Sequence, residues 1–239
     1  MTKALVLAGG ESSRMGTDKA LVIWNGLPML ELVCRSAWGC CEDVSVLTPW
    51  PDRYREKVPS VSRWIEESRP GRGPLLALAE GWEKILMLAS RQGDDTEWLL
   101  LLGCDLPLLQ PEILRQWASQ LPSLPPNILA LVPQKEGRWE PLCGFYRRPA
   151  WEHLKEFILL PPSPSLPVSE SPRLRVSESP SLRVSESPRL RVSPSPRPPL
   201  RPSLQKWLGL LPVQPLILAE REARMLLNCN RPSDLPPNP

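Results

Sequence analysis

Short apolar runs without a regular polar alternation recur along the first two-thirds of the chain, and they limit its fold more than any other feature. They cover residues 3–8, 43–48, 62–67, 97–105, 128–133 and 141–146. Such runs suit strands that are buried on both faces, as in a parallel sheet covered by helices. Helical patterns at 28–39, 73–91 and 111–121 lie between them. We therefore expect an α/β fold: a Rossmann-like open, mostly parallel sheet with helices on both faces.

The composition changes abruptly between residues 161 and 203. The octapeptides VSESPRLR, VSESPSLR and VSESPRLR follow one another, and proline and serine make up more than half of the segment. Regularly spaced prolines interrupt helices and sheet ladders, and the apolar surface is too small to offset the entropy of ordering. We expect a disordered low-complexity insertion in a single domain formed by 1–160 and 204–239. The alternative is a docking or phosphorylation tract, since arginines accompany each Ser-Pro.

Charge and cysteine content exclude several classes of protein. The 161–203 segment carries seven arginines and three glutamates, so the remainder of the +3 chain is close to neutral, at about −1. We expect no nucleic-acid partner, and no membrane partner, because no apolar run reaches the ~18 residues of a spanning helix. Six cysteines without a C-x-x-C pair, and no signal peptide, indicate reduced thiols in a cytoplasmic protein. The single histidine, His153, excludes chemistry that needs two.

The loop after the first predicted strand is the strongest functional signal. The strand ends at Ala8, and Gly9 and Gly10 follow at the strand end where open α/β sheets bind ligands. Glycines there let backbone N–H groups approach a nucleotide, and the cations Arg14 and Lys19 suit phosphates. The loop matches neither G-x-G-x-x-G nor the P-loop pattern. Residues alone leave a second interpretation open, namely a glycine turn beside ordinary surface cations.

The order of residues in this loop resembles a known signature. LAGGESSRMGTDKAL fits L-A-G-G-x-S-x-R-M-G-x-D-K, which resembles the signature of nucleotidyltransferases that build nucleotide-linked cofactors and sugars. Within them the chain is similar to the molybdenum cofactor guanylyltransferases, the molybdopterin-guanine dinucleotide biosynthesis protein A family. Cytidylyl-transferring relatives typically have L-A-A-G, so Gly9, the first glycine of the pair in LAGG, favours guanine. Weaker matches follow in the family's order, and these are RPGRGPLLAL (69–78), LLLLGCDLPLL (99–109), EPLCGFY (140–146) and NCNRPSDL (228–235).

The resemblance implies a reaction and its participants. Enzymes of this family transfer GMP from GTP to molybdopterin, with or without molybdenum, and release pyrophosphate in a Mg²⁺-dependent reaction. GTP and molybdopterin are the expected small-molecule partners. Proteins that deliver molybdopterin, and molybdoenzymes that accept the product, are further possible partners.

The resemblance also assigns roles to individual residues. It implies that Arg14, Lys19 and Asp105 are catalytic, with Arg14 on the departing pyrophosphate and Asp105 as the Mg²⁺ ligand. The expected GTP-binding residues are Leu7, Ala8, Gly9, Gly10, Lys19, Glu67 and Asp105. The amides of Asn228 and Asn230 are expected to bind the acceptor; a turn before Pro232 is the alternative.

Two positions depart from the family's pattern and keep other functions open. Thr48 stands where asparagine is frequent, and Glu67 where aspartate is usual, although Glu67 still offers a carboxylate to guanine N1–H and N2–H₂. One alternative is therefore a nucleotidyltransferase of the same fold with another base or acceptor, such as cytidylyl transfer to molybdopterin or a sugar phosphate. The other is a nucleotide-binding scaffold that acts through its Ser-Pro repeat.

Overall fold

The structure is a computed structural model, and it describes residues 1–9, 18–159, 203–229 and 234. The predicted disordered insertion at 161–203 lies outside the described residues except for Ser203, so its state and the proposed single-domain boundaries stay predictions.

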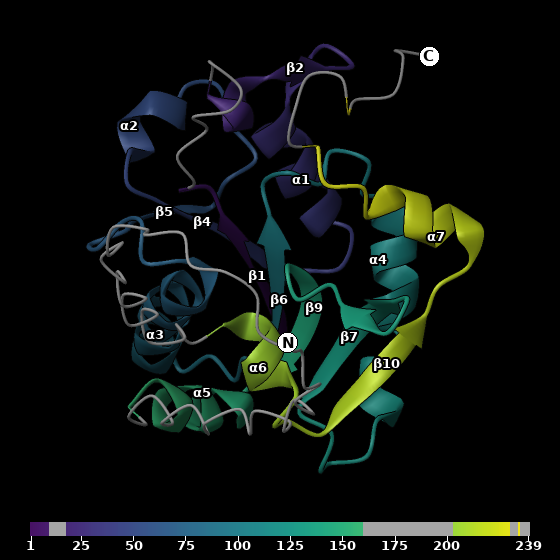
Figure 1. Cartoon of the computed structure of the whole chain (residues 1–239). Coiled ribbons are helices and arrows are strands. Elements are labelled where there is room, and N and C mark those ends of the chain that lie inside the picture. The colour runs from purple at the N-terminus through teal and green to yellow at the C-terminus, as the bar shows by residue number, and fades with distance from the viewer. Residues whose placement is uncertain (10–17, 160–202, 230–233, 235–239) are drawn as a thin grey trace, which may run out of the picture. The chain divides into compact units, whose positions relative to one another are not determined.

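An eight-stranded sheet forms the centre of the described chain (Figure 1). Its strands are β1 (Thr2–Leu7), β4 (Asp43–Thr48), β5 (Arg63–Glu66), β6 (Trp98–Gly103), β7 (Ala130–Lys135), β8 (Arg138–Trp139), β9 (Cys143–Arg147) and β10 (Val213–Ile217). They run in the order β10-β7-β9-β6-β1-β4-β5, with β8 paired to β7. The pairs β6–β1, β1–β4, β4–β5 and β10–β7 are parallel, whereas β9 is antiparallel to both of its neighbours. The predicted open, mostly parallel sheet is confirmed.

Helices cover both faces of this sheet, as the apolar strands predicted. They are α1 (Met29–Ala37), α2 (Pro51–Tyr54), α3 (Pro74–Gln92), α4 (Pro111–Ala118), α5 (Ala150–Leu159), α6 (Leu204–Leu208) and α7 (Glu220–Met225). The helices divide between two hydrophobic clusters. One cluster contains residues of α1, α4 and α7, and the other contains residues of α3, α5 and α6. Neighbouring residues of one strand go to opposite clusters, because side chains alternate across a strand. Leu100 and Leu102 of β6 therefore face α1 and α4, while Leu99 and Leu101 face α3.

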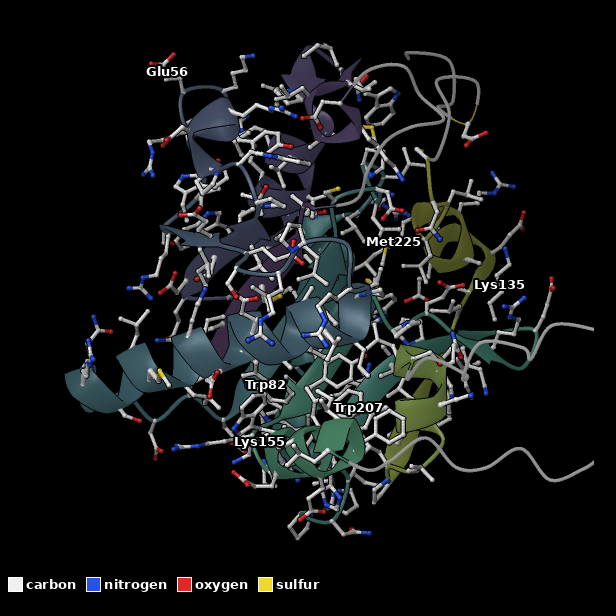
Figure 2. The ribbon with its side chains drawn as sticks, turned by 60° about the vertical axis from the view of Figure 1, so that its left-hand side comes forward. Glu56, Trp82, Lys135, Lys155, Trp207 and Met225 are labelled. Carbon is white, nitrogen blue, oxygen red and sulfur yellow. The ribbon has the colours of Figure 1, made fainter. Side chains whose placement is uncertain are left out.

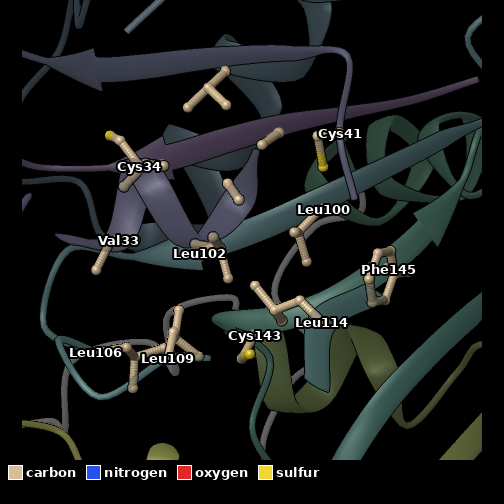
Figure 3. Packing of buried hydrophobic residues seen from close by; sticks show 14 of the residues in the cluster. Val33, Cys34, Cys41, Leu100, Leu102, Leu106, Leu109, Leu114, Cys143 and Phe145 are labelled. Carbon is tan, nitrogen blue, oxygen red and sulfur yellow. The ribbon is translucent and has the colours of Figure 1, made fainter. Parts of the chain in front are cut away.

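The first cluster combines aliphatic and aromatic side chains with several cysteines. Figure 3 shows Val33 and Cys34 of α1 packed near Leu102 of β6, with Leu114 of α4 and Phe145 of β9 on the same face. All five are fully buried. Complete burial of a side chain of this size contributes about 1.5–3 kcal/mol relative to exposure.

The second cluster is aromatic. Tyr146 of β9 stacks on Trp207 of α6 at 5.4 Å between ring centroids and meets the edge of Trp82 of α3 at 6.2 Å. Figure 2 shows Trp82 and Trp207 on the same side of the ribbon. Because α5 and α6 share this cluster, the described residues on either side of the 160–202 segment belong to one core.

Two details differ from the sequence-based expectations or add to them. An Asn25–Gly26 turn with positive φ at both residues joins two short strands, β2 (Ile23–Trp24) and β3 (Leu27–Pro28). This is the turn that Asn-Gly favours in two-residue hairpins, and we had not predicted it. The expected strand over 97–105 ends at Gly103, so Asp105 lies in the following turn.

The remaining compositional expectations can be checked in the described chain. All six cysteines are free thiols in the structure. His153 lies on the exposed face of α5. No helix among the described residues is both long and apolar enough to cross a membrane.

Gly39, just after α1, provides a test of how closely α1 and α4 approach. A methyl group built on Gly39 would lie 2.7 Å from Pro111 Cβ and 2.8 Å from the Pro111 carbonyl oxygen. We expect Gly39→Ala to lower the free energy of unfolding by about 1–3 kcal/mol, the usual cost of overpacking, in urea denaturation. Gly209→Ala is the control, because its methyl group meets no atom closer than 3.4 Å. Equal stability of the two variants would contradict the close approach.

Candidate functional site

The carboxyl ends of four parallel strands meet at one edge of the sheet. Three backbone hydrogen bonds extend the ladders beyond the strands: Ala8 N–H to Leu47 O (2.9 Å), Cys104 N–H to Leu7 O (3.2 Å) and Glu67 N–H to Thr48 O (2.9 Å). Glu67 is the donor of one of these bonds, and Gly9 and Asp105 come directly after the donors of the other two. Parallel pairing therefore brings together three of the predicted site residues, from positions almost a hundred residues apart.

Lys19 and Asp105 form the central contact of this edge. Lys19 Nζ lies 3.0 Å from Asp105 Oδ2, and the two side chains are only 15 % and 19 % exposed. Charges held this far from water are weakly screened, so the attraction between them is stronger than that between two solvent-exposed ions. The ammonium comes from the loop after β1 and the carboxylate from the turn after β6. The sequence predicted both residues as catalytic and GTP-binding, and the structure places them in direct contact.

Gly103 allows the Asp105 carboxylate to fold back over the end of β6. A methyl group built on Gly103 would lie 2.6 Å from Asp105 Oδ1. Any larger residue at 103 would displace the carboxylate. This role of Gly103 was not predicted from the sequence. A glycine at the end of an otherwise leucine-rich strand could have indicated it.

Gly9 and Glu67 form a second close contact across the end of β4. A methyl group built on Gly9 would lie 2.5 Å from Glu67 Oε2 and 3.1 Å from Pro49 Cδ. The absence of a side chain at Gly9 therefore makes space for the Glu67 carboxylate. Both were predicted GTP-binding residues, and the structure brings them together.

The Glu67 carboxyl group has an altered acidity. Burial raises its pKa above the usual range, and the nearby charge of Glu80 raises it further. The residue is 9 % exposed. Ionisation of Glu67 therefore costs free energy in the folded protein, which is typical of groups held for binding or chemistry.

The C-terminal element joins the same edge. The Cys229 N–H donates to the Asp105 carbonyl oxygen over 3.0 Å. Asn228, the predicted acceptor-binding residue, precedes Cys229 in the sequence and is exposed. The Cys229 bond therefore holds Asn228 near the turn that contains Asp105. Gly10, Arg14 and Asn230, the other predicted site residues of the two loops, lie outside the described residues.

Polar groups of three further residues form hydrogen bonds at the end of the sheet, and these residues are Leu7, Ala8 and Thr48. The Leu7 carbonyl and the Ala8 N–H take part in the ladder bonds described above. A carbonyl oxygen accepts two hydrogen bonds, so Leu7 O retains one lone pair for a ligand. Thr48 is fully buried, and its hydroxyl accepts from the Trp50 N–H over 3.3 Å.

A further carboxylate, Glu140, lies within electrostatic range of Asp105. Burial raises the pKa of Glu140 and the charge of Asp105 contributes to that rise, whereas Lys135 and Arg138 oppose it. Glu140 precedes β9, the strand antiparallel to β6, and that pairing brings it to this edge. No sequence spacing indicated it.

Cys104, beside Asp105, is a buried thiol. Burial raises its pKa to about 12, with a further contribution from the charge of Asp105. The thiolate needed for nucleophilic attack is therefore absent at neutral pH. The expectation that Cys104 packs rather than reacts agrees with this environment.

Asp105 suits a Mg²⁺ ion that arrives with a phosphate ligand. Among the described residues no three His, Cys, Asp or Glu side chains gather into a metal-binding group. Magnesium is commonly held by only one or two carboxylates together with substrate phosphates and water. The Asp105 carboxylate, folded over Gly103 and accompanied by Lys19, fits that type of site.

The sequence of the chain is similar to those of known proteins. Residues 4–161 match the MobA-like NTP transferase domain family. A probable molybdenum cofactor guanylyltransferase of Trichormus variabilis is 38 % identical over 97 % of this chain and 87 % of its own length. One from Synechococcus elongatus is 35 % identical over 97 % of this chain and 94 % of its own.

Solved structures agree on the fold. The crystal structure of molybdopterin-guanine dinucleotide biosynthesis protein A from Archaeoglobus fulgidus superposes with a TM-score of 0.62 at 17 % identity, covering 97 % of this chain and 94 % of that one. A nucleotidyl transferase from Methanothermobacter thermautotroptrophicus gives 0.60 at 15 % identity, covering 98 % and 94 %.

The raised pKa of Glu67 predicts a pH-dependent cost in stability. A folded-state pKa above the unfolded value stabilises the fold at low pH, and that contribution is lost as the pH rises through the folded-state pKa. We expect Glu67→Gln to unfold at a higher temperature than the wild type at about pH 7.5, with the advantage shrinking towards about pH 4.

Glu80→Gln is the matched control, with the opposite sign. Burial opposes ionisation of Glu80, but hydrogen bonds from Lys84 and Ser68 outweigh it and lower its pKa. Glu80→Gln should therefore destabilise the protein at neutral pH. A Glu67→Gln advantage that did not change with pH would show that charge burial is not its cause.

Proposed function

We infer the reaction from one premise: the chain belongs to the MobA-like NTP transferase domain family, and it is a nucleotidyltransferase. We propose that it transfers GMP from GTP to molybdopterin and releases pyrophosphate. The observation that carries the proposal is the Lys19–Asp105 contact at the carboxyl edge of the sheet, beside Gly9 and Glu67. Relatives that are 35–38 % identical over nearly the whole chain carry the name molybdenum cofactor guanylyltransferase.

The base would be recognised next to Gly9. The ionised Glu67 carboxylate accepts two hydrogen bonds, and guanine presents N1–H and N2–H₂ as a matching pair of donors. Because Gly9 has no side chain, the Glu67 carboxylate lies close to the backbone of the opening loop, beside which the base is proposed to bind. A site that hydrogen-bonds a particular base discriminates strongly against bases that lack the donors, because its buried acceptor is then left unpaired.

The triphosphate would lie between Lys19 and Asp105. The ammonium contacts phosphate oxygens as a point charge, and Arg14 in the same loop is proposed to contact the departing pyrophosphate. Asp105 would hold Mg²⁺, which when bound supplies neutralisation of the phosphate charge. In the absence of ligand, Lys19 and Asp105 neutralise each other, so neither charge is buried without compensation.

The chain itself would contribute positioning rather than a nucleophile. An oxygen of the acceptor phosphate forms the new bond to the α-phosphorus of GTP, and the bond to the β-phosphate bridging oxygen breaks. Pyrophosphate leaves with that electron pair. Holding the two phosphates in line removes much of the entropic barrier. Asn228, tied to the Asp105 turn through Cys229, is proposed to bind the acceptor.

The choice of base is the first test of this proposal. We expect kcat/KM with molybdopterin to be at least about a hundredfold higher for GTP than for CTP, UTP or ATP. Dinucleotide formation is measured with each labelled nucleoside triphosphate. Glu67→Gln should reduce this preference, because an amide cannot accept both hydrogen bonds. A wild-type preference for CTP or UTP would reject guanylyl transfer and favour the alternative of another base.

Asp105→Asn tests the proposed metal ligand. We expect kcat to fall by about a hundredfold or more, as when a group that stabilises transition-state charge is removed. Asp94→Asn is the matched control, because it breaks a similarly buried Lys–Asp pair, with Lys3, in which the side chains are 6 % and 14 % exposed. That pair lies at the start of β1, away from the site. Near-normal turnover of Asp105→Asn at saturating Mg²⁺ would exclude its role.

A further inference from the structure

A cluster around Asp18 connects the short helix α2 to the loop that carries Lys19. One carboxylate oxygen of Asp18, Oδ2, accepts hydrogen bonds from the Tyr54 hydroxyl (2.7 Å) and from Arg53 Nη1 (3.0 Å). The other, Oδ1, accepts from the Ala20 N–H at 3.1 Å. Both oxygens are therefore used, and they join two segments that are 35 residues apart in the sequence.

The backbone beside Lys19 is held by the same residue. Asp18 caps the 3₁₀ turn η1 (Lys19–Leu21), and its carbonyl oxygen accepts from the Leu21 N–H at 3.0 Å. Ala20, next to Lys19, is buried in the first hydrophobic cluster. With Asp18 fixed on one side and Ala20 on the other, the Cα of Lys19 is held in place. This holds the Lys19 backbone at a position from which its side chain reaches Asp105.

Tyr54 is a rigid support for this arrangement. It is 1 % exposed, and its ring stacks on Trp64 of β5 at 6.2 Å between centroids. Burial raises the pKa of the Tyr54 hydroxyl well above its usual value, and the bond to Asp18 adds to the rise. The hydroxyl therefore remains a donor at all ordinary pH values. Arg53 is half exposed and lies over the Trp50 ring at 4.7 Å, which limits its movement.

We propose that Tyr54 and Arg53 are positioning residues that act through Asp18 to fix Lys19 for the triphosphate. Neither needs to touch the ligand, and neither belongs to the signature loop. Contacts with α2 order the Lys19 turn when the protein folds. The entropic cost of ordering this turn therefore does not reduce the affinity for GTP. This inference rests on the proposed GTP-dependent function.

A double-mutant cycle on GTP affinity distinguishes positioning from general stabilisation. Tyr54→Phe removes one oxygen and retains the stacked ring. We expect it to raise the Kd for a fluorescent GTP analogue with Mg²⁺ by about fivefold to tenfold, within the loss typical of one intramolecular hydrogen bond. In a Lys19→Ala background it should have almost no further effect, because coupled residues are not additive. Thermal unfolding without nucleotide should change equally in both backgrounds.

Two further variants complete the experiment. Arg53→Gln, at a half-exposed position, is expected to fold normally and to give a smaller loss that also disappears in the Lys19→Ala background. Tyr146→Phe is the matched control, since it removes a hydroxyl from another fully buried tyrosine, where the partner is the Pro141 carbonyl at 2.8 Å. Its GTP affinity should be unchanged.

The outcomes separate this inference from the function on which it rests. Equal losses from Tyr54→Phe with and without Lys19, no loss at all, or an equal loss in Tyr146→Phe would each overturn the positioning role while leaving GTP binding intact. An unchanged affinity in Lys19→Ala would do the same. A wild-type protein that bound no GTP would overturn the proposed function, and the positioning role with it.

Discussion

The parallel pairing of β1 with β4 and β6 is the constraint on which the site depends. Parallel strands end at the same edge, so residues that follow β1, β5 and β6 in the sequence become neighbours in space. One further backbone hydrogen bond extends the pairing beyond the end of β1, β5 and β6. Gly9, Glu67 and Asp105 lie at or directly after the donors of these bonds, which brings them to this edge. The two hydrophobic clusters pack against the sheet from both sides and hold the strands that carry these polar groups.

The charges at this edge are arranged so that each partly buried ion is compensated or kept for a ligand. Asp105 is paired with Lys19, and Asp18 is satisfied by Tyr54, Arg53 and a backbone N–H. Glu67 is different, because burial and Glu80 both oppose its ionisation. A carboxylate that is costly in the free protein gains the most from a ligand that brings donors, so the unfavourable electrostatics of Glu67 favour binding over stability.

Several features of the site had no signal in the sequence. Glu140 comes near Asp105 only because β9 runs antiparallel to β6, and an apolar run does not state its direction. Tyr54 and Arg53 lie on a four-residue helix without amphipathic periodicity, so their contact with Asp18 could not be predicted.

Two other features did have a signal in the sequence. The role of Gly103 could have been predicted, since a glycine in a buried strand marks a close approach. The Asn25–Gly26 hairpin was also readable from its turn residues.

By itself, the sequence determined the class of sheet, most of its elements and the chemistry of the opening loop. Unbroken apolar runs can only be buried on both faces, and the loop's glycines, cations and spacing are local properties. The tertiary structure decided which side chains meet: Lys19 with Asp105, Gly9 with Glu67, and Asp18 with α2. These contacts join segments 35 to 86 residues apart. They arise from strand order and direction, which depend on the packing of the whole sheet rather than on any one segment.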